Sequence, residues 1–460
     1  MLELANIFKY KKTTLTYIVI SCLLYLWFAY GIERTDLTQL LLIYVLLFVC
    51  AYQIIKTSGF YFRVLVISSI VFRLLFLFAM PNLSQDFFRF IWDGRMILEG
   101  FNPYLYTPDS FIQNGNLPIS QAQELYDGMG ALSSSHFTNY PPINQLCFVL
   151  GNLFPGNSIL SSVIGMRLII ISADIGTLYF GKKLLERLKL PSNRIFWYML
   201  NPFIIIELTG NLHFEGVMIF FLVWALYLLH NNKWKCAAVV FAFSISVKLI
   251  PLMFLPLFFW WFIKIKHEGS MEVSTTAGII KLITFYVIIG LVILVLFLPF
   301  FSTEFINNYS KTVGLWFGDF EFNASIYYIA RAIGYSISGY NEIATITRIF
   351  PIVSLLIIIS FSFFKTNNSI PKLTTSMLLA FTCYLFLSTT VHPWYISTLV
   401  ILCVFSRYKF PLVWSIVIVL SYLAYANAAN NENLFVIGLE YLIVFFVFVW
   451  EVILKKTIKL

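Results

Sequence analysis

The residues best suited to chemistry gather in one polar stretch, residues 84–108, within an otherwise apolar sequence. Its acidic and basic side chains are interleaved with aromatic ones in the order Asp86, Phe87, Phe88, Arg89, Phe90, Trp92, Asp93, Arg95, Glu99, Phe101, Tyr104 and Tyr106. Carboxylates can accept protons, arginines can bind anions, and aromatic rings favour the boundary between membrane and water. This combination suits a site that holds a polar headgroup attached to an apolar tail.

Composition assigns the chain to the integral membrane proteins. Of 460 residues, 60% are hydrophobic and 12% are charged, and the mean hydropathy is +0.83. Soluble domains average about 25% charged residues. We expect an all-α polytopic protein that forms one integral membrane domain over residues 1–460. The six cysteines show no metal-ligand spacing, so we interpret them as small buried apolar residues.

Apolar segments that could cross a membrane recur along the whole chain. We count about 14 transmembrane helices, within a range of roughly 11 to 14, because several segments are shorter than the ~20 residues that a span needs. The predicted spans are 14–32, 38–56, 61–80, 158–181, 194–210, 215–230, 235–248, 250–264, 278–301, 342–364, 373–390, 393–406, 410–428 and 434–454. Residues 81–158 form a large first loop, in which Pro141 and Pro142 begin a short apolar helix that we expect to lie in the interface.

The distribution of basic residues predicts the orientation of these spans. Of the 31 Lys and Arg residues, 22 fall in loops on the side of the N-terminus and three fall within spans. The opposite side has only Arg34, Arg89, Arg95, Lys248, Lys311 and Arg331. The positive-inside rule therefore places both termini in the cytoplasm and the loop 81–158 outside. The net charge of +9 is then a topology signal, and no nucleic-acid partner is needed to explain it.

With this topology, polar residues from several separate loops lie on the outer side. Besides the first loop, the outer loops carry His213, Glu215, Lys248, Asp319, Glu321 and His392. Acid, histidine and lysine side chains from different loops are typical of an active site, whereas a transporter more often places its charges within broken helices at mid-membrane. Other interpretations are a turn at Asp93, interfacial histidines, and a Lys248 that extends its charge to the membrane surface. A lone charge in an apolar hairpin favours a phosphate partner for Lys248.

Short motifs in the first loop carry a resemblance to a known superfamily. The segments DFFRF, WDG and GFNPY, followed by NYPP before a short helix, are similar to the first outer loop of GT-C glycosyltransferases. The chain most resembles the bacterial mannosyltransferases that use polyprenyl-phosphate sugars, and more distantly the eukaryotic GPI mannosyltransferase I. The motif residues are confined to 86–104, 139–145, 201–216, 246–252 and 391–395.

The resemblance implies a function and assigns roles. It implies transfer of a hexose, expected to be mannose, from a polyprenyl-phosphate donor to a hydroxyl of a glycan, glycolipid or protein, with inversion of the anomeric centre. It also implies a bacterial inner (plasma) membrane and an active site that faces the periplasm or exterior, with Asp86 as the base. The candidate substrate-binding residues are Arg89, Asp93, Arg95, Tyr104, Tyr140, His213, Glu215, Lys248 and His392. No clean DxD motif is present, so we expect no metal site and no cofactor beyond the lipid-linked donor.

Two other functions remain open from the sequence. A flippase or transporter of lipid-linked sugars would share the spans and the apolar surroundings of the polar residues. The large outer loop and the lack of an obvious duplicated half favour the enzyme. A membrane scaffold without activity would explain the apolar composition but not the polar residues gathered in the outer loops.

Overall fold

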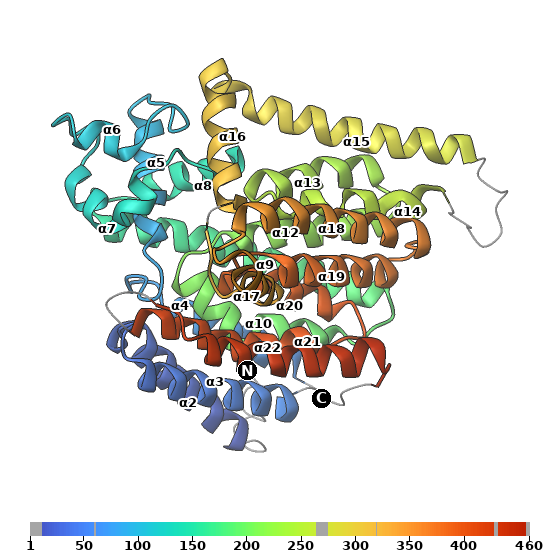
Figure 1. Cartoon of the computed structure of the whole chain (residues 1–460). Coiled ribbons are helices and arrows are strands. Elements are labelled where there is room, and N and C mark those ends of the chain that lie inside the picture. The colour runs from blue at the N-terminus through green and yellow to red at the C-terminus, as the bar shows by residue number, and fades with distance from the viewer. Residues whose placement is uncertain (1–11, 59–60, 264–274, 319, 427–430, 457–460) are drawn as a thin grey trace.

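The protein is built from helices that lie side by side, with a separate group of short helices at one end (Figure 1). The computed structural model describes residues 12–58, 61–263, 275–318, 320–426 and 431–456. Within these ranges the chain contains no strand, only an isolated β-bridge between Phe322 and Thr390. The prediction of an all-α protein is therefore confirmed.

The helices follow one another with few long connections. The first half comprises α2 (Lys12–Gly31), α3 (Leu37–Ser58), α4 (Phe62–Leu74), α5 (Asp86–Leu98), α6 (Pro108–Ile112), α7 (Ala122–Ser134), α8 (Pro142–Asn152), α9 (Ile159–Arg187), α10 (Phe196–Met199), α11 (Pro202–Ile204) and the π-helix η2 (Ile205–Gly210). The second half comprises α12 (Glu215–His230), α13 (Trp234–Val247), α14 (Phe259–Ile263), α15 (Thr275–Phe297), α16 (Thr303–Gly318), α17 (Ile326–Ser338), α18 (Ile343–Phe364), α19 (Ile370–Leu387), α20 (Ile396–Val404), α21 (Phe410–Val417) and α22 (Leu434–Phe448).

Within the described residues, each predicted span coincides with helical structure, but fewer of these helices are long enough to cross a membrane alone. Within the described ranges, seven are long and apolar enough, or up to eight when the bent pair Pro202–Gly210 and Glu215–His230 is taken as one span. The remaining apolar helices have 10–17 residues, and they include Ile250–Ile263 and Phe410–Ala426. Prolines and tight 3₁₀ turns interrupt these segments, as at Pro256, so the count of about 14 spans is not confirmed.

The exposed side chains of the long helices are apolar, which indicates that lipid surrounds these helices. On α15, Leu291 is 57% exposed, Leu294 60% and Val295 62%. A continuous apolar surface of this kind is rarely left in water. The chain is therefore an integral membrane protein, as its composition predicts.

Residues 81–158, the predicted first outer loop, fold into the helices α5 to α8, and α8 packs on α9 of the remaining structure. The WDG motif has a structural role here, because a Cβ atom added at Gly94 would lie 2.6 Å from the carbonyl oxygen of Phe148 on α8. The predicted short helix after Pro142 is confirmed as α8, which also contacts α13. The loop thus forms a compact helical group against the membrane helices.

The helices α16 and α17 were not predicted. They lie between the predicted spans 278–301 and 342–364, where the sequence predicts only a loop. On α17, Ile329, Ile333 and Ile337 recur at helical spacing and are 61%, 53% and 81% exposed. This amphipathic pattern is the signal that a search for long apolar runs overlooks.

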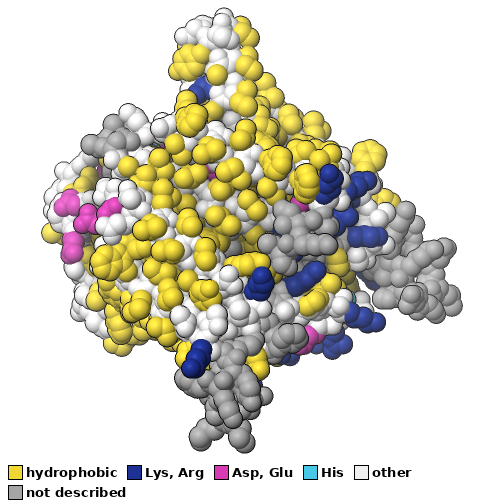
Figure 2. All heavy atoms as spheres, turned by 90° about the horizontal axis from the view of Figure 1, so that it is seen from below, with side chains coloured by type: hydrophobic (Ala, Val, Ile, Leu, Met, Phe, Trp, Pro, Cys, Tyr) yellow, Lys and Arg dark blue, Asp and Glu magenta, His cyan; other side chains and the backbone are white. Residues whose placement is uncertain are grey.

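Charged side chains are sorted between the two ends of the molecule. On the face in Figure 2, most of the visible Lys and Arg side chains gather at the right-hand end and most of the Asp and Glu side chains at the left-hand end. Apolar side chains occupy the surface between them. This arrangement is the one that the positive-inside rule produces in a membrane protein.

A labelling experiment tests the predicted orientation. Asn116 is exposed in the first outer loop, and the native Cys236 is exposed near the start of α13, beside Lys233 and Lys235. In intact cells, an impermeant thiol reagent should label Asn116→Cys, because the loop is predicted to face outward. The same reagent should label Cys236 only after permeabilisation. The reverse pattern would contradict the orientation.

Candidate active site

Asp86 is the first residue of α5, where the chain leaves the membrane helices and enters the outer loop. Its side chain is partly buried, and its backbone N–H donates to Ser84 Oγ at 3.3 Å. A carboxylate at a helix N-terminus is stabilised by the dipole of the helix. The position therefore presents a carboxylate at the base of the outer loop.

A buried ion pair lies beside this carboxylate. Lys248 Nζ, just after α13, is 3.1 Å from an oxygen of Glu215, the first residue of α12. Glu215 is completely buried, whereas the side chain of Lys248 is 17% exposed. The same ammonium group lies 4.9 Å from the ring centre of Tyr140. Three segments far apart in the sequence thus meet at one point, as the sequence predicted for Tyr140, Glu215 and Lys248.

The surroundings raise the pKa of Asp86 towards the neutral pH range. Burial raises the pKa of Asp86 to about 6; the charge of Lys248 opposes the increase and that of Glu215 adds to it. Arg89 is three residues after Asp86, and this spacing on a helix predicts that the two side chains are neighbours and that Arg89 keeps Asp86 ionised. The structure contradicts this pairing. Arg89 Nε donates to Asp93 at 2.7 Å, one turn further along α5. A carboxyl group with a pKa near 6 can exchange a proton at neutral pH.

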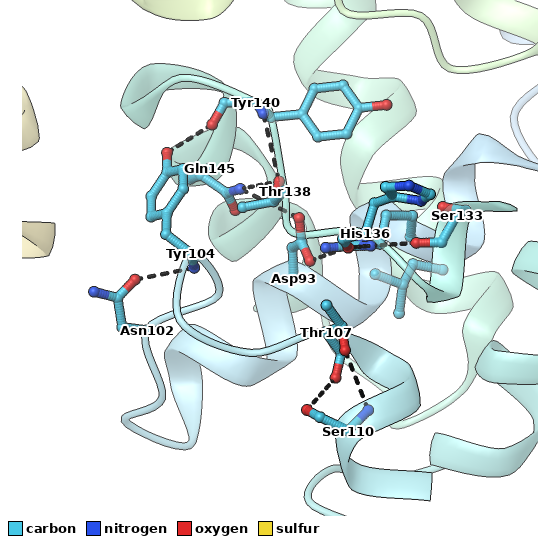
Figure 3. Close-up of polar contacts among 12 residues, drawn as sticks. Asp93, Asn102, Tyr104, Thr107, Ser110, Ser133, His136, Thr138, Tyr140 and Gln145 are labelled. Atoms are coloured by element: carbon cyan, nitrogen blue, oxygen red, sulfur yellow. Dashed lines mark hydrogen bonds and ion pairs between the residues drawn. The ribbon is translucent and has the colours of Figure 1, made fainter. Parts of the chain in front are cut away.

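Arg89 and Asp93 belong to a separate buried network inside the outer loop (Figure 3). Arg89 also donates to the carbonyl oxygens of Ser133 and His136, and Gln145 Nε2 donates to Asp93 at 3.2 Å. Both charged side chains are almost inaccessible, at 5% and 1% exposure. The network joins α5 to the end of α7 and to α8. The Arg89–Asp93 ion pair therefore has a structural role.

Arg95 and Tyr104 also have partners within the protein. Arg95 Nη1 donates to the carbonyl oxygen of Ser120 at 2.7 Å, and its Nε to Asn152 at 3.2 Å. The hydroxyl of Tyr104 donates to the carbonyl oxygen of Tyr140 at 2.6 Å, as Figure 3 shows. Tyr104 therefore positions Tyr140, which does lie beside Lys248. Within the described part of the chain, neither Arg95 nor Tyr104 contacts Asp86, so their role as substrate ligands remains a prediction.

The two histidines converge on one tryptophan. The ring of His213 stacks on Trp394 at 3.8 Å between centroids, and His392 stacks on the same indole at 4.5 Å. Phe322 packs against His392 at 5.3 Å. The segment around Phe322 is tied to the His392 loop by a backbone bond from Val391 N to Phe322 O of 2.8 Å. His213 and His392 therefore reach one cluster, as predicted; Asp319 lies outside the described residues.

Glu207 is a polar residue of this cluster that the sequence analysis missed. It lies in η2, where the chain bends by 115° before α12. One carboxylate oxygen accepts from the Tyr422 hydroxyl at 2.8 Å, and the other lies 3.8 Å from His213 Nε2. π-Helices are often found at functional sites, and Leu212 has a left-handed φ of 61° just after this one. The sequence did contain a signal for Glu207, because an acidic residue within an apolar span usually marks a functional site.

Several polar atoms of the cluster lack hydrogen bonds within the described part of the chain. These buried atoms include Glu207 Oε2, His213 Nε2, Glu215 Oε2 and His392 Nδ1, whereas Glu215 Oε1 is paired with Lys248. Buried polar groups are nearly always satisfied, so a group of open donors and acceptors marks a place where polar ligands or water bind. Carboxylates and imidazoles together can bind the hydroxyl groups of a sugar.

Across the described ranges, no three His, Cys, Asp or Glu side chains converge closely enough to hold a metal ion. The expectation of no metal site remains a prediction.

Two comparisons with known proteins relate this chain to the same group of enzymes. The family model for "Alpha-(1->6)-mannopyranosyltransferase, N-terminal domain" matches residues 16–264, more than half of the chain. The "Alpha-(1->6)-mannopyranosyltransferase A" of Mycobacterium tuberculosis is 20% identical over 193 residues, which is 42% of this chain and 36% of that protein. The protein of the same name from Corynebacterium glutamicum is 20% identical over 185 residues, 40% of this chain and 36% of the relative. The matched stretch thus spans about a third of each relative.

The buried Arg89–Asp93 pair generates a stability prediction. Arg89→Met should destabilise the protein by about 3–5 kcal/mol, because it leaves the Asp93 charge buried without its partner. The melting temperature of the purified protein in detergent measures this loss. Asp86→Asn should melt near the wild type, because burial already disfavours the charged form of Asp86 in the folded protein. An Arg89→Met protein with wild-type melting but without donor binding would instead assign Arg89 to the substrate.

Proposed function

Because the chain belongs to the alpha-(1->6)-mannopyranosyltransferase family, we propose that it is a membrane glycosyltransferase that moves mannose from a polyprenyl-phosphate donor to a hydroxyl of a glycan acceptor. The observation that carries this proposal is the meeting of Asp86 with Lys248, Glu215 and the histidine cluster at one end of the membrane helices. The family match includes Asp86, Glu215 and Lys248 and ends before His392.

Asp86 acts as the general base of a direct displacement. It accepts the proton of the acceptor hydroxyl as the hydroxyl oxygen bonds to the anomeric carbon. The bond from that carbon to the phosphate oxygen breaks, and the lipid phosphate leaves with the electron pair. A single carboxylate acting in this way inverts the anomeric centre. Lys248 stabilises the negative charge that develops nearby.

The apolar surroundings suit a donor with a lipid tail. An open groove with a volume of ≈ 430 Å³ runs between α15 and α16, and its lining consists of Leu294, Phe297, Leu298, Phe301, Phe305 and Tyr309. Tyr104 packs on Phe305 at 5.1 Å and bonds to Tyr140, which contacts Lys248. We assign this groove to the polyprenyl chain, whose phosphate would then reach the polar cluster.

The topology follows from the same proposal. The active site faces the periplasm or exterior of a bacterial inner membrane, and both termini are cytoplasmic, in agreement with the sorted charges of Figure 2. Transport of lipid-linked sugars, the alternative that the sequence left open, is less well supported because the relatives are named as transferases.

Replacement of the base tests the proposed reaction. Asp86→Asn keeps the size of the side chain but cannot accept a proton, so the transfer rate should fall by about 10²–10⁴ with little change in donor binding. Asp127→Asn is the matched control, because Asp127 is exposed in the same loop, and it should transfer at the wild-type rate. Wild-type turnover by Asp86→Asn together with a well-folded but inactive Asp93→Asn would assign the base to Asp93.

The pH dependence provides an independent check on the same residue. With a pKa of about 6, Asp86 is protonated and inactive as a base below that pH and deprotonated above it. The value of kcat/KM should therefore rise as the pH increases through about 6 and then level off. A profile of purified protein from about pH 5 to pH 8 measures this step. A rate that is flat across this range, or that falls as the pH rises, contradicts the assignment.

A further inference from the structure

A phosphate donor needs a cation at the site, and most of the cations on the outer side are already matched within the protein. Arg89 is paired with Asp93, and Arg331 with Glu321. Arg95 donates to neutral oxygens inside the outer loop, including that of Ser120 at 2.7 Å. These guanidinium groups hold the fold together and are poor candidates for a ligand that must enter and leave.

The remaining cations differ in their relation to the site. Lys248 reaches it, but its charge is matched by Glu215 at 3.1 Å. Lys311 is exposed on α16, and its charge is not among those that act on Asp86 or Glu207. The cluster itself is rich in acid, since Asp86 and Glu207 have no paired cation of their own in the described ranges. A phosphate that approaches this cluster therefore requires a further positive charge.

Arg34 meets this requirement. It lies between α2 and α3, is partly exposed, and its guanidinium carbon is 4.7 Å from the ring centre of Tyr425. Among the ion pairs and hydrogen bonds of the described residues, none occupies its side-chain nitrogens. A cation held on an aromatic face keeps its N–H groups available for an anion.

Tyr425 connects Arg34 to the candidate active site. Its hydroxyl lies within electrostatic range of both Asp86 and Arg34. Its ring packs on Phe322 at 6.0 Å and on Tyr422 at 6.0 Å, and the Tyr422 hydroxyl binds Glu207.

The backbone brings the Arg34 loop and the Asp86 segment together as well. Asn82, four residues before Asp86, donates to the carbonyl oxygens of Phe28 and Ile32 at 2.8 and 3.1 Å. These bonds fix the end of α2, and with it the start of the loop that carries Arg34, against the chain that leads into α5. The Tyr425 ring thus contacts the Arg34 guanidinium directly, and the Asn82 side chain holds the start of the Arg34 loop against the segment that leads into Asp86.

We propose that Arg34 binds the phosphate group of the lipid-linked donor, an assignment that rests on the proposed function. The planar guanidinium can donate two parallel hydrogen bonds to phosphate oxygens, which an ammonium group cannot do. The phosphate would lie between Arg34 and Lys248, on the Asp86 side of Tyr425. Arg34 thereby holds the leaving group while Asp86 activates the acceptor.

Kinetics with three variants test the assignment. Arg34→Gln should raise the KM for a polyprenyl-phosphate mannose by about 10–100-fold, the loss expected for charge-assisted hydrogen bonds, and leave the KM for the acceptor unchanged. Arg34→Lys keeps the positive charge but cannot donate two parallel hydrogen bonds, so it should give a donor KM between those of the wild type and Arg34→Gln. Lys311→Gln removes a charge from the same side of the membrane and should behave as wild type. An unchanged donor KM in Arg34→Gln, or an equal increase in Lys311→Gln, overturns the proposal.

A binding measurement separates this proposal from the proposed function, because it requires no transfer. Wild-type protein in neutral nanodiscs should bind farnesyl phosphate at least ~10-fold more tightly than farnesol, and Arg34→Gln should lose this preference. If this holds while no mannose transfer is detected, the proposed function fails and the phosphate site stands. If the preference survives in Arg34→Gln, the phosphate binds elsewhere and the assignment fails. If inorganic phosphate competes as well as farnesyl phosphate, Arg34 binds free phosphate rather than the lipid-linked group, which also overturns the proposal.

Discussion

One buried guanidinium group fixes the geometry on which the candidate site depends. Arg167, on α9, is completely buried and donates to the carbonyl oxygens of Thr209 at 2.9 Å, Gly210 at 2.9 Å, Leu77 at 3.1 Å and Ala79 at 2.7 Å. A helix that bends by 115° inside a membrane leaves carbonyl groups without helical partners, and each costs several kcal/mol if unsatisfied. Arg167 satisfies these groups. It thereby ties the turn that presents His213 and Glu215 to the chain that leads into Asp86.

The same geometry gives neighbouring acids different electrostatic states. Glu215 has Lys248 as a partner at 3.1 Å, and Asp93 has Arg89 at 2.7 Å, so both are matched by a cation. Asp86 is close to Lys248, but burial and the charge of Glu215 outweigh that attraction and raise its pKa. Two carboxylates in contrasting environments can divide the roles of proton acceptor and fixed charge. In the proposed reaction, Asp86 takes the proton and Glu215 keeps Lys248 in place.

Much of this arrangement could be predicted from the sequence, because span positions and the sorting of basic residues determine which loops share an end. That reasoning brought Asp86, His213, Lys248 and His392 to the same side, and the structure places them in one cluster. The sequence did not predict which carboxylate pairs with Arg89, because acidic residues lie within one helical turn on both sides of it. Arg89 pairs with Asp93, four residues later, rather than with Asp86, three residues earlier. Glu207 was missed because the hydropathy of its segment predicts a continuous apolar span. The average hydropathy of a stretch of sequence does not reveal the 115° bend that follows Glu207.

The central claim is that one carboxylate drives an inverting transfer from a lipid-linked mannosyl phosphate. In the proposed reaction the product is the α-mannoside that the family description names, so inversion requires a β-linked donor. The most direct test supplies purified protein in detergent, where transport is impossible, with synthetic polyprenyl-phosphate mannose of each anomeric configuration. The account predicts transfer from the β-phosphate alone, with an α-mannoside as product. An α-mannoside formed from the α-phosphate, or no transfer from either donor, would contradict it.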